Sequence, residues 1–373
     1  MKKVSIMTFH ASHNYGSCLQ AYALQNVIKA LNYDCEIINF RTDRQKDLYT
    51  VFTKRKGIKY LLKNCAHLLY YRALKKKYNR FEDFIHNFLA LSEKEYSTLT
   101  ELENASFDYD FFVAGSDQIW NPIPADFDWA YYLPFVHDKK KIAYAPSLGP
   151  LSTTEKIHEE QKIKEFIKQF DVISVREITS AEKLHALVGE EFDISLVLDP
   201  TLLLSRDKWK NLIKEEPIIK DDYILLYTLF SNPTINKIAK KLSKHLKMPV
   251  VTTNFSNQYD VFTCYKKKFD VGPLEFLNLL YNSKFVLATS FHGTVFSVLF
   301  EKPFFAIDGD KDARIAYLLK KCDLENRAIN LSNTDEKLFT AFDVYFDKAK
   351  VALAEEREHS LVFLKKALVV EGE

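Results

Sequence analysis

The segment from Ser290 to Pro303 combines residue types that can hold an anion and move a proton. It reads Ser-Phe-His-Gly-Thr-Val-Phe-Ser-Val-Leu-Phe-Glu-Lys-Pro and follows the apolar run 284–288, which predicts a strand. The His292–Gly293 pair predicts the start of a helix that ends at Pro303. The first turn of a helix presents backbone N–H groups and the positive end of the helix dipole, both of which stabilise anions. The pattern therefore predicts a site for a charged small molecule beside a titratable imidazole.

A polar loop is predicted between the first strand, 4–9, and the first helix, 17–31. It presents backbone N–H groups, hydroxyls and two imidazoles, and its glycine permits a tight turn. The alternative is that Asn14 and Ser17 are only turn and cap residues. The chain has no G-x-G-x-x-G motif, so a nicotinamide cofactor is not expected. The residues of this loop that could contact a ligand are His10, His13, Asn14, Tyr15 and Gly16.

A third polar group follows the predicted strand 109–114. Asp117 could act there as a base or bind a ligand hydroxyl, with Gln118 and Asn121 as further hydrogen-bonding groups. The alternative is that Asp117 caps a short helix and Trp120 packs in the core. The two interpretations are compatible, because a cap at the carboxyl end of a strand also lies where ligands bind in open α/β sheets.

Three cationic side chains could recognise an anion. Arg176 comes directly after the predicted buried strand 172–175, and a guanidinium there suits bidentate recognition of a carboxylate or phosphate. The alternative for Arg176 is an ion pair with Glu177 or Asp171. Lys311 and Arg314 follow the next strand after the Ser290–Pro303 segment; they could complete a cationic pocket or simply begin a solvated helix.

Strand-like and helix-like runs alternate along the chain, which is typical of an α/β protein with parallel sheets. At 373 residues the chain exceeds the size of most single cores, so two α/β domains facing a cleft are expected. We expect an N-terminal domain over 1–204, a linker within 205–222 and a C-terminal domain over 205–335. The charged, periodic stretch 336–373 predicts one or two final helices.

The composition excludes several classes of protein. Lys plus Arg total 52 against 50 for Asp plus Glu, so the net charge of +2 gives no reason to expect nucleic-acid binding. The five cysteines are scattered and lack metal-ligand spacing, so neither a disulfide framework nor a zinc site is expected. The N-terminus does not look like a signal peptide, and no apolar run approaches the ~18 residues of a membrane span. A cytoplasmic protein is expected.

Residues 54–80 form a basic amphipathic segment. It contains ten Lys or Arg and no acidic residue, interleaved with leucines and tyrosines. Such a pattern can lie on an anionic membrane surface. The alternative is a solvated helical face over an ordinary core contact.

Taken together, these segments resemble the polysaccharide pyruvyl transferase family. The resemblance rests on six segments, which occur in the family's order and span roughly residues 4 to 320. They are the His-Asn-Tyr-Gly-Ser loop with the Leu-Gln-Ala-Tyr-Ala-Leu-Gln that follows it, Gly115 to Asn121, Tyr144 to Gly149, Ser174 to Glu177, Asp199 to Thr201, and Ser290 to Pro303.

The resemblance implies two Rossmann-like domains of glycosyltransferase-B type that transfer pyruvyl from phosphoenolpyruvate to a sugar of a surface polysaccharide or its lipid-linked precursor. It implies His292 as general acid, or as a phosphate ligand only, and Asp117 or His10 as base. No metal or further cofactor is needed. The family usually has Arg at the position of Ser290, so Lys311 or Arg314 is expected to supply that charge. The implied donor-binding residues are Arg176, Ser290, Gly293, Thr294, Lys311 and Arg314. The implied acceptor-binding residues are His10, His13, Asn14, Tyr15, Gly16, Gln118, Trp120 and Asn121.

Two other functions remain compatible with the sequence. One is a glycosyltransferase or epimerase of the same architecture that uses a nucleotide sugar, because a fold does not settle a function. The other is a glycan-binding or scaffolding protein without turnover, against which the presence of His292, Gly293 and Asp117 argues. The partners expected in the first case are phosphoenolpyruvate, a glycan or lipid-linked oligosaccharide and, through residues 54–80, the inner face of the plasma membrane.

Overall fold

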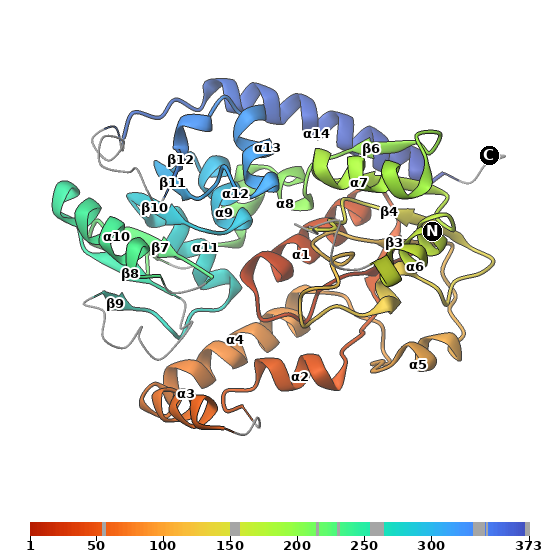
Figure 1. Cartoon of the computed structure of the whole chain (residues 1–373), viewed down its shortest axis with the longest axis horizontal. Helices are drawn as coiled ribbons and strands as arrows, with labels where there is room; N and C mark the ends of the chain where they lie inside the picture. Colours follow the sequence, from red (N-terminus) through yellow and green to blue (C-terminus); the bar gives the residue numbers. More distant parts are fainter. Residues whose placement is uncertain are drawn as a thin grey trace. The chain divides into compact units, whose positions relative to one another are not determined.

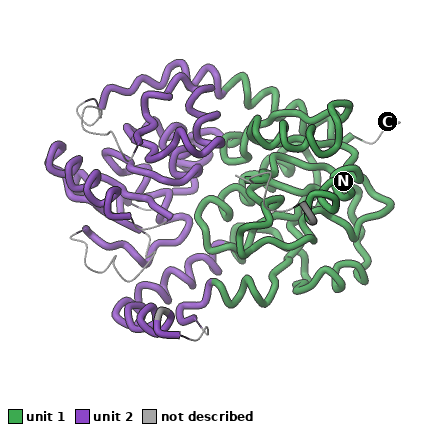
Figure 2. The backbone as a smooth tube through the Cα atoms, in the orientation of Figure 1, with its two compact units in different colours: residues 1–48, 85–204, 354–373 green, residues 49–84, 205–353 purple. Residues whose placement is uncertain are grey.

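The structure is a computed structural model, and it describes residues 1–53, 57–149, 157–213, 216–229, 232–253, 265–330, 340 and 342–369. Parts of the basic segment (54–56), of the expected linker (214–215) and of the predicted C-terminal region (336–339, 341 and 370–373) lie outside these residues, as does Cys264. The chain divides into two compact units (Figure 2). Unit 1 comprises residues 1–48, 85–204 and 354–373, and unit 2 comprises residues 49–84 and 205–353.

Unit 1 is built on a six-stranded sheet of order β2-β1-β3-β4-β5-β6, in which every pairing is parallel. Figure 1 labels β3, β4 and β6 of this sheet. The central strand β3, Phe-Phe-Val-Ala, is apolar and buried throughout, as expected for a strand covered on both faces. The strands are β1 Lys3–Met7, β2 Asp34–Ile37, β3 Phe111–Ala114, β4 Lys140–Ala143, β5 Val172–Val175 and β6 Ile194–Leu196. The helices that begin in this unit are α1 Tyr15–Ala30, α2 Asp43–Tyr49, α5 Leu99–Glu103, η1 Trp129–Tyr132, α6 Ile157–Ile167, α7 Ile178–Val188 and α8 Pro200–Leu203.

Unit 2 contains a second parallel six-stranded sheet, of order β12-β11-β10-β7-β8-β9. Strands β7, β10 and β11 of this sheet are buried throughout and contain no charged residue. The strands are β7 Ile224–Tyr227, β8 Val250–Thr252, β9 Lys266–Lys267, β10 Phe285–Ala288, β11 Phe304–Ile307 and β12 Ala328–Ile329. The helices that begin here are α3 Ile58–Leu69, α4 Tyr71–Phe88, α9 Arg206–Leu212, α10 Pro233–Leu246, α11 Pro273–Asn282, α12 Phe291–Leu299, α13 Ala313–Lys321, η3 Glu325–Arg327 and α14 Asp347–Ala367. Among the described residues, no helix is both long and apolar enough to cross a bilayer.

The α/β class with two parallel sheets agrees with the sequence prediction. Residues 49–84, which were expected in the N-terminal domain, cluster with unit 2, and residues 354–373, for which no domain was predicted, cluster with unit 1. Residues 49–84 belong to unit 2 because Arg80 forms ion pairs with Asp270 (Nη1–Oδ2, 3.1 Å) and Glu275 (Nε–Oε1, 2.9 Å). Residues 354–373 return to unit 1, where the Leu198 N–H donates to Ser360 Oγ at 2.9 Å. Contacts between residues so distant in sequence leave no trace in local periodicity.

Gly115 shows how closely neighbouring strand ends approach in unit 1. It follows β3 with a φ of +143°, and a Cβ added there would lie 1.9 Å from the backbone oxygen of Tyr144, which follows β4. A backbone oxygen cannot move aside without disturbing the sheet. Glycine is therefore required at this position by both conformation and space.

We expect Gly115→Ala to lower the free energy of unfolding by at least ~3 kcal/mol, because it adds a steric clash to an unfavourable φ. Gly57→Ala is the matched control, since Gly57 also has positive φ (+125°) but its added Cβ would meet only Tyr60 Cδ2 at 3.7 Å. The control should cost only the conformational strain, about 1–2 kcal/mol. Urea denaturation of both variants measures the difference, and equal losses would refute the clash.

Candidate functional site

The strand order of unit 1 marks the place where a ligand site is expected. In the order β2-β1-β3, the strands β2 and β3 lie on opposite sides of β1. The carboxyl ends of β1 and β3 therefore flank a topological switch point. Open α/β sheets bind ligands outside the carboxyl ends of the strands at such a point. The loop 8–14 after β1 and the loop 115–118 after β3 both lie there, and these are two of the polar groups predicted from sequence.

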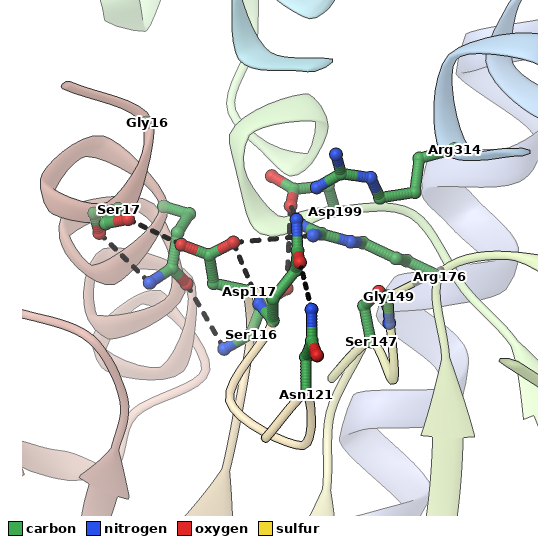
Figure 3. Close-up of polar contacts among 12 residues, drawn as sticks. Gly16, Ser17, Ser116, Asp117, Asn121, Ser147, Gly149, Arg176, Asp199 and Arg314 are labelled. Atoms are coloured by element: carbon green, nitrogen blue, oxygen red, sulfur yellow. Dashed lines mark hydrogen bonds and ion pairs between the residues drawn. The ribbon is translucent and has the colours of Figure 1, made fainter. Parts of the chain in front are cut away.

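Asp117 is held at this switch point by donors from three segments of the chain. Its Oδ2 accepts a hydrogen bond from Ser17 Oγ on α1 at 2.5 Å. Its Oδ1 accepts from the Gln118 N–H at 2.9 Å and lies 3.4 Å from Arg176 Nη2. Figure 3 shows these side chains pointing toward one another. The residue is buried and has a φ of +77°, so both its backbone and its carboxylate are fixed in one orientation.

Arg176 joins three carboxylates inside unit 1. It follows β5, its side chain is 1% exposed, and its guanidinium lies 2.8 Å from Asp199 Oδ2 through Nη1 and 3.5 Å from Glu177 Oε2 through Nε. Burial lowers the pKa of Arg176, but Asp117, Asp199 and Glu177 together outweigh that effect, and the pKa stays above its usual value. These contacts match the alternative prediction of an ion pair with Glu177. They show Arg176 engaged with carboxylates of its own unit rather than open to an external anion.

Further hydrogen bonds bind this cluster to its neighbours. Asp199 Oδ1 accepts from the Thr201 N–H at 3.0 Å and from Thr201 Oγ1 at 2.6 Å, and so caps α8. Ser116 Oγ donates to the backbone oxygen of Ala145 at 2.7 Å. The sequence did not predict Ser17 or Asp199 as site residues. Asp199 is the first acidic residue after β6, and this position at the carboxyl end of a strand could have indicated it.

The remaining predicted acceptor residues divide into buried and partly exposed ones. His10 is fully buried, and its ring contacts Thr8 O and Asn39 Oδ1, each at 3.3 Å. Trp120 is also fully buried and stacks on Tyr132 at a centroid distance of 5.3 Å, as its packing alternative predicted. Both side chains therefore belong to the core of unit 1 and have no exposed surface with which to contact a sugar.

Asn14 has the capping role that the alternative gave it, since its Oδ1 accepts from the Gly16 N–H at 2.9 Å at the start of α1. Tyr15 and Gly16 are buried in the first turn of that helix. Asn121 is buried too and donates to Gln118 Oε1 at 2.7 Å. His13, Asn14 and Gln118 are partly exposed. These three are the predicted acceptor residues whose side chains reach the surface.

Unit 2 has its own switch point, between β7 and β10. The two strand ends are joined there by a hydrogen bond from the Leu229 N–H to Thr289 Oγ1 at 3.2 Å. Helix α12 then begins at Phe291, one residue before His292, with Ser290 as its cap: Ser290 Oγ accepts from the Gly293 N–H at 3.0 Å. The predicted strand, turn and helix over 284–303 are thus confirmed, and His292 lies in the first turn of the helix.

Gly293 allows α12 to pack closely on the sheet. A Cβ at this position would lie 2.8 Å from Tyr227 Cδ1 on β7 and 3.0 Å from the Ala288 Cβ on β10. Thr294 is fully buried and donates through Oγ1 to the Ser290 backbone oxygen at 3.1 Å. Both residues fix the helix start on the sheet and so determine where His292 lies.

The two predicted cations of unit 2 have different surroundings. The Arg314 guanidinium carbon lies 5.6 Å from the centroid of the Phe291 ring, which also contacts the His292 ring edge-on at 5.2 Å. Arg314 forms a paired contact with its own helix cap, Asp312 (Nη2–Oδ2, 2.6 Å). Lys311 pairs instead with Asp308 at 3.0 Å. The structure therefore places Arg314 beside the first turn of α12.

Two parallel six-stranded units of this kind define a protein with a GT-B-like fold of two Rossmann-like domains. The fold is shared with UDP-GlcNAc 2-epimerase from Methanocaldococcus jannaschii, at 14% identity and a TM-score of 0.55 over 93% of each chain. It is also shared with a putative UDP-N-acetylglucosamine 2-epimerase from Listeria monocytogenes (12%, 0.59, 98% of this chain and 96% of that one) and with the Neisseria meningitidis UDP-GlcNAc 2-epimerase bound to UDP-GlcNAc (11%, 0.53, 99% of each).

The family model described as polysaccharide pyruvyl transferase matches residues 14–311, which include α1, the loop after β3 and the whole switch point of unit 2. The chain belongs to this family. No curated protein matches the sequence.

Burial of His10 makes the stability of unit 1 depend on pH. Burial lowers the pKa of His10 to about 4, against 6.5 for an exposed imidazole. Between these pH values the unfolded chain binds a proton at His10 that the folded chain does not bind. The contribution of neutral His10 to the free energy of unfolding is therefore fully present above pH 6.5 and is lost as the pH falls toward 4. We expect this residue to contribute about 3 kcal/mol to the loss over that window. Urea unfolding of the wild type and of His10→Gln at several pH values measures it: the variant should show a shallower acid dependence, and parallel curves would contradict the assignment.

Proposed function

We propose that this protein transfers the pyruvyl group of phosphoenolpyruvate to a sugar of a surface polysaccharide or of its lipid-linked precursor, forms a cyclic ketal and releases phosphate. The observation that carries the proposal is membership of the polysaccharide pyruvyl transferase family over residues 14–311. The polar residues at the switch point of each unit support it, because they are the types that this reaction requires.

Unit 2 is the proposed donor side. Phosphoenolpyruvate carries a phosphate and a carboxylate that need positive partners. The first turn of α12 supplies the positive end of a helix dipole, and Arg314 supplies a guanidinium beside Phe291. This chain has Ser290 where the family usually has Arg, and the position of Arg314 supports it as the replacement. Lys311, paired with Asp308, is the less direct candidate.

The proposed chemistry begins with proton transfer from His292 to the methylene carbon of phosphoenolpyruvate, which becomes the methyl group of the product. A sugar hydroxyl then adds to the oxocarbenium-like carbon and gives up its proton. The C–O bond to phosphate breaks, phosphate leaves with the bonding electron pair, and a second hydroxyl of the same sugar closes the ketal. Atoms balance, because one sugar diol and one phosphoenolpyruvate give one ketal and one phosphate.

Unit 1 is the proposed acceptor side, with Asp117 as the base toward the sugar hydroxyl. The Ser17, Gln118 and Arg176 contacts hold its carboxylate in one orientation, which favours repeated proton transfer in a fixed geometry. Arg176 acts as a positioning residue in this scheme. His13, Asn14 and Gln118 are the side chains proposed to reach the sugar. We propose a cytoplasmic location for the enzyme, where phosphoenolpyruvate is available.

We expect His292→Ala to reduce phosphate release from phosphoenolpyruvate by at least ~100-fold, because the reaction loses its general acid. His185→Ala is the matched control, since His185 lies on α7 of unit 1, where its ring contacts the Gly189 carbonyl oxygen. Phosphate release and a product mass gain of one pyruvyl ketal should be followed together over a panel of free and lipid-linked sugars. Wild-type turnover by His292→Ala would remove this residue from the mechanism.

Asp117→Asn should lower kcat by roughly 100-fold with little change in KM for phosphoenolpyruvate, since the base acts on the acceptor. Asp110→Asn is its control, because Asp110 lies at the opposite, amino end of β3 and accepts from the Lys3 N–H at 2.7 Å. Urea midpoints of both variants separate lost folding from lost chemistry.

Turnover of a nucleotide sugar without phosphoenolpyruvate would support the glycosyltransferase or epimerase alternative. Glycan binding without any turnover would support the alternative of a glycan-binding or scaffolding protein.

A further inference from the structure

Helix α3 turns its apolar residues outward. Ile58, Leu61, Leu62, Leu68 and Leu69 have relative exposures of 53% to 80%. Their spacing of i, i+3, i+4, i+10 and i+11 places them on one face of the helix, which we call the α3 face. A surface helix of a globular protein normally turns such a stripe toward the core. The α3 face therefore exposes to solvent the apolar residues that a surface helix usually buries.

Polar contacts fix this orientation from the opposite side of the helix. Asn64 forms two hydrogen bonds with the backbone of Thr53, accepting from its N–H through Oδ1 and donating to its carbonyl oxygen through Nδ2, each at 3.1 Å. His67 contacts the carbonyl oxygen of Val51 through Nδ1, and Ala66 is buried beside it. Asn64 and His67, which make these contacts, and the buried Ala66 form the inner side of α3. Turning the leucines inward would break these contacts.

The segment that carries the α3 face is strongly basic. Residues 54–80 contain ten Lys or Arg and no Asp or Glu. Arg72 and Lys75, at the start of α4, are exposed. Lys76 and Arg80, further along α4, instead pair with Asp270 of unit 2. The surface thus combines an apolar stripe with nearby cations and has no acidic side chain in its own segment.

Two aromatic residues flank α3 in the sequence and stack on each other. Phe52 and Tyr71 stack with their centroids 5.5 Å apart and their planes at 6°, and both remain partly open to solvent. Tyrosine combines an apolar ring with a polar tip and is enriched at membrane interfaces for that reason. Along the sequence, Tyr71 lies between Leu69, the last residue of the α3 face, and the exposed Arg72.

We propose that the α3 face binds the surface of an anionic lipid bilayer. A bilayer of this kind offers an apolar interior to the leucines and a negative surface to the cations, and it matches both properties of the segment. The proposal does not depend on the pyruvyl transfer reaction, because membrane binding is measured without turnover. If both hold, the surface brings the enzyme to lipid-linked acceptors.

Co-sedimentation of the purified full chain with vesicles tests the proposal. We expect binding to phosphatidylcholine vesicles that contain about 30% phosphatidylglycerol, little binding to phosphatidylcholine alone, and weaker binding as salt is raised. Leu61→Gln/Leu68→Gln/Leu69→Gln should weaken binding at least ~10-fold, because it removes the apolar contact. Arg72→Gln/Lys75→Gln should weaken it by roughly fivefold for each charge at low salt.

Val351→Gln is the matched control, because Val351 is also largely exposed but lies on α14. It should bind vesicles like the wild type, and all variants should keep the wild-type melting temperature, since the changed side chains are exposed. Equal binding to neutral and anionic vesicles, or undiminished binding by the triple leucine variant, would overturn the proposal. So would a wild-type dimer in sedimentation velocity that the triple variant dissociates, with no vesicle binding, since the α3 face would then pair with a second copy.

Discussion

The buried guanidinium of Arg176 is the interaction on which the architecture of unit 1 depends. It contacts Asp117 after β3, Glu177 at the start of α7 and Asp199 at the start of α8, so one side chain links three strand-to-helix junctions. Removing one partner of a buried charge network leaves the others uncompensated and typically costs about 3–5 kcal/mol. The carboxylate of Asp117 therefore has its orientation set by the interior of the unit, and any chemistry at that carboxylate depends on the same network.

The switch points of the two units carry different residue types. Each sheet has one switch point, between β1 and β3 in unit 1 and between β7 and β10 in unit 2, and polar loops follow those strands there. Unit 1 places an acidic cluster at its point, whereas unit 2 places a helix start with His292 and, beside Phe291, a guanidinium. Acidic groups suit proton removal from a hydroxyl, and a helix start beside a cation suits a phosphate. This division of chemical character supports the assignment of acceptor and donor sides.

The sequence was informative where the physics is local. The alternation of strand-like and helix-like runs predicted the parallel sheets, and residues 284–303 predicted a strand, a turn and a helix that the structure contains. Where the physics is long-range, prediction failed or left alternatives open. The sequence around Arg80 does not indicate that this residue pairs with Asp270, which is 190 residues away. That pairing holds residues 49–84 in unit 2. Similarly, the polar type of His10 suggested a ligand contact, but its position just after β1 buries it completely.

In the proposed reaction, this protein protonates the methylene carbon of phosphoenolpyruvate and passes the resulting pyruvyl group to a sugar. Running the reaction in deuterium oxide and examining the product by mass spectrometry and proton NMR tests that step directly. We expect a pyruvyl ketal whose methyl group carries a single deuterium from solvent, formed together with phosphate. A ketal methyl without solvent deuterium, or no ketal from phosphoenolpyruvate with any sugar of the panel, would contradict it.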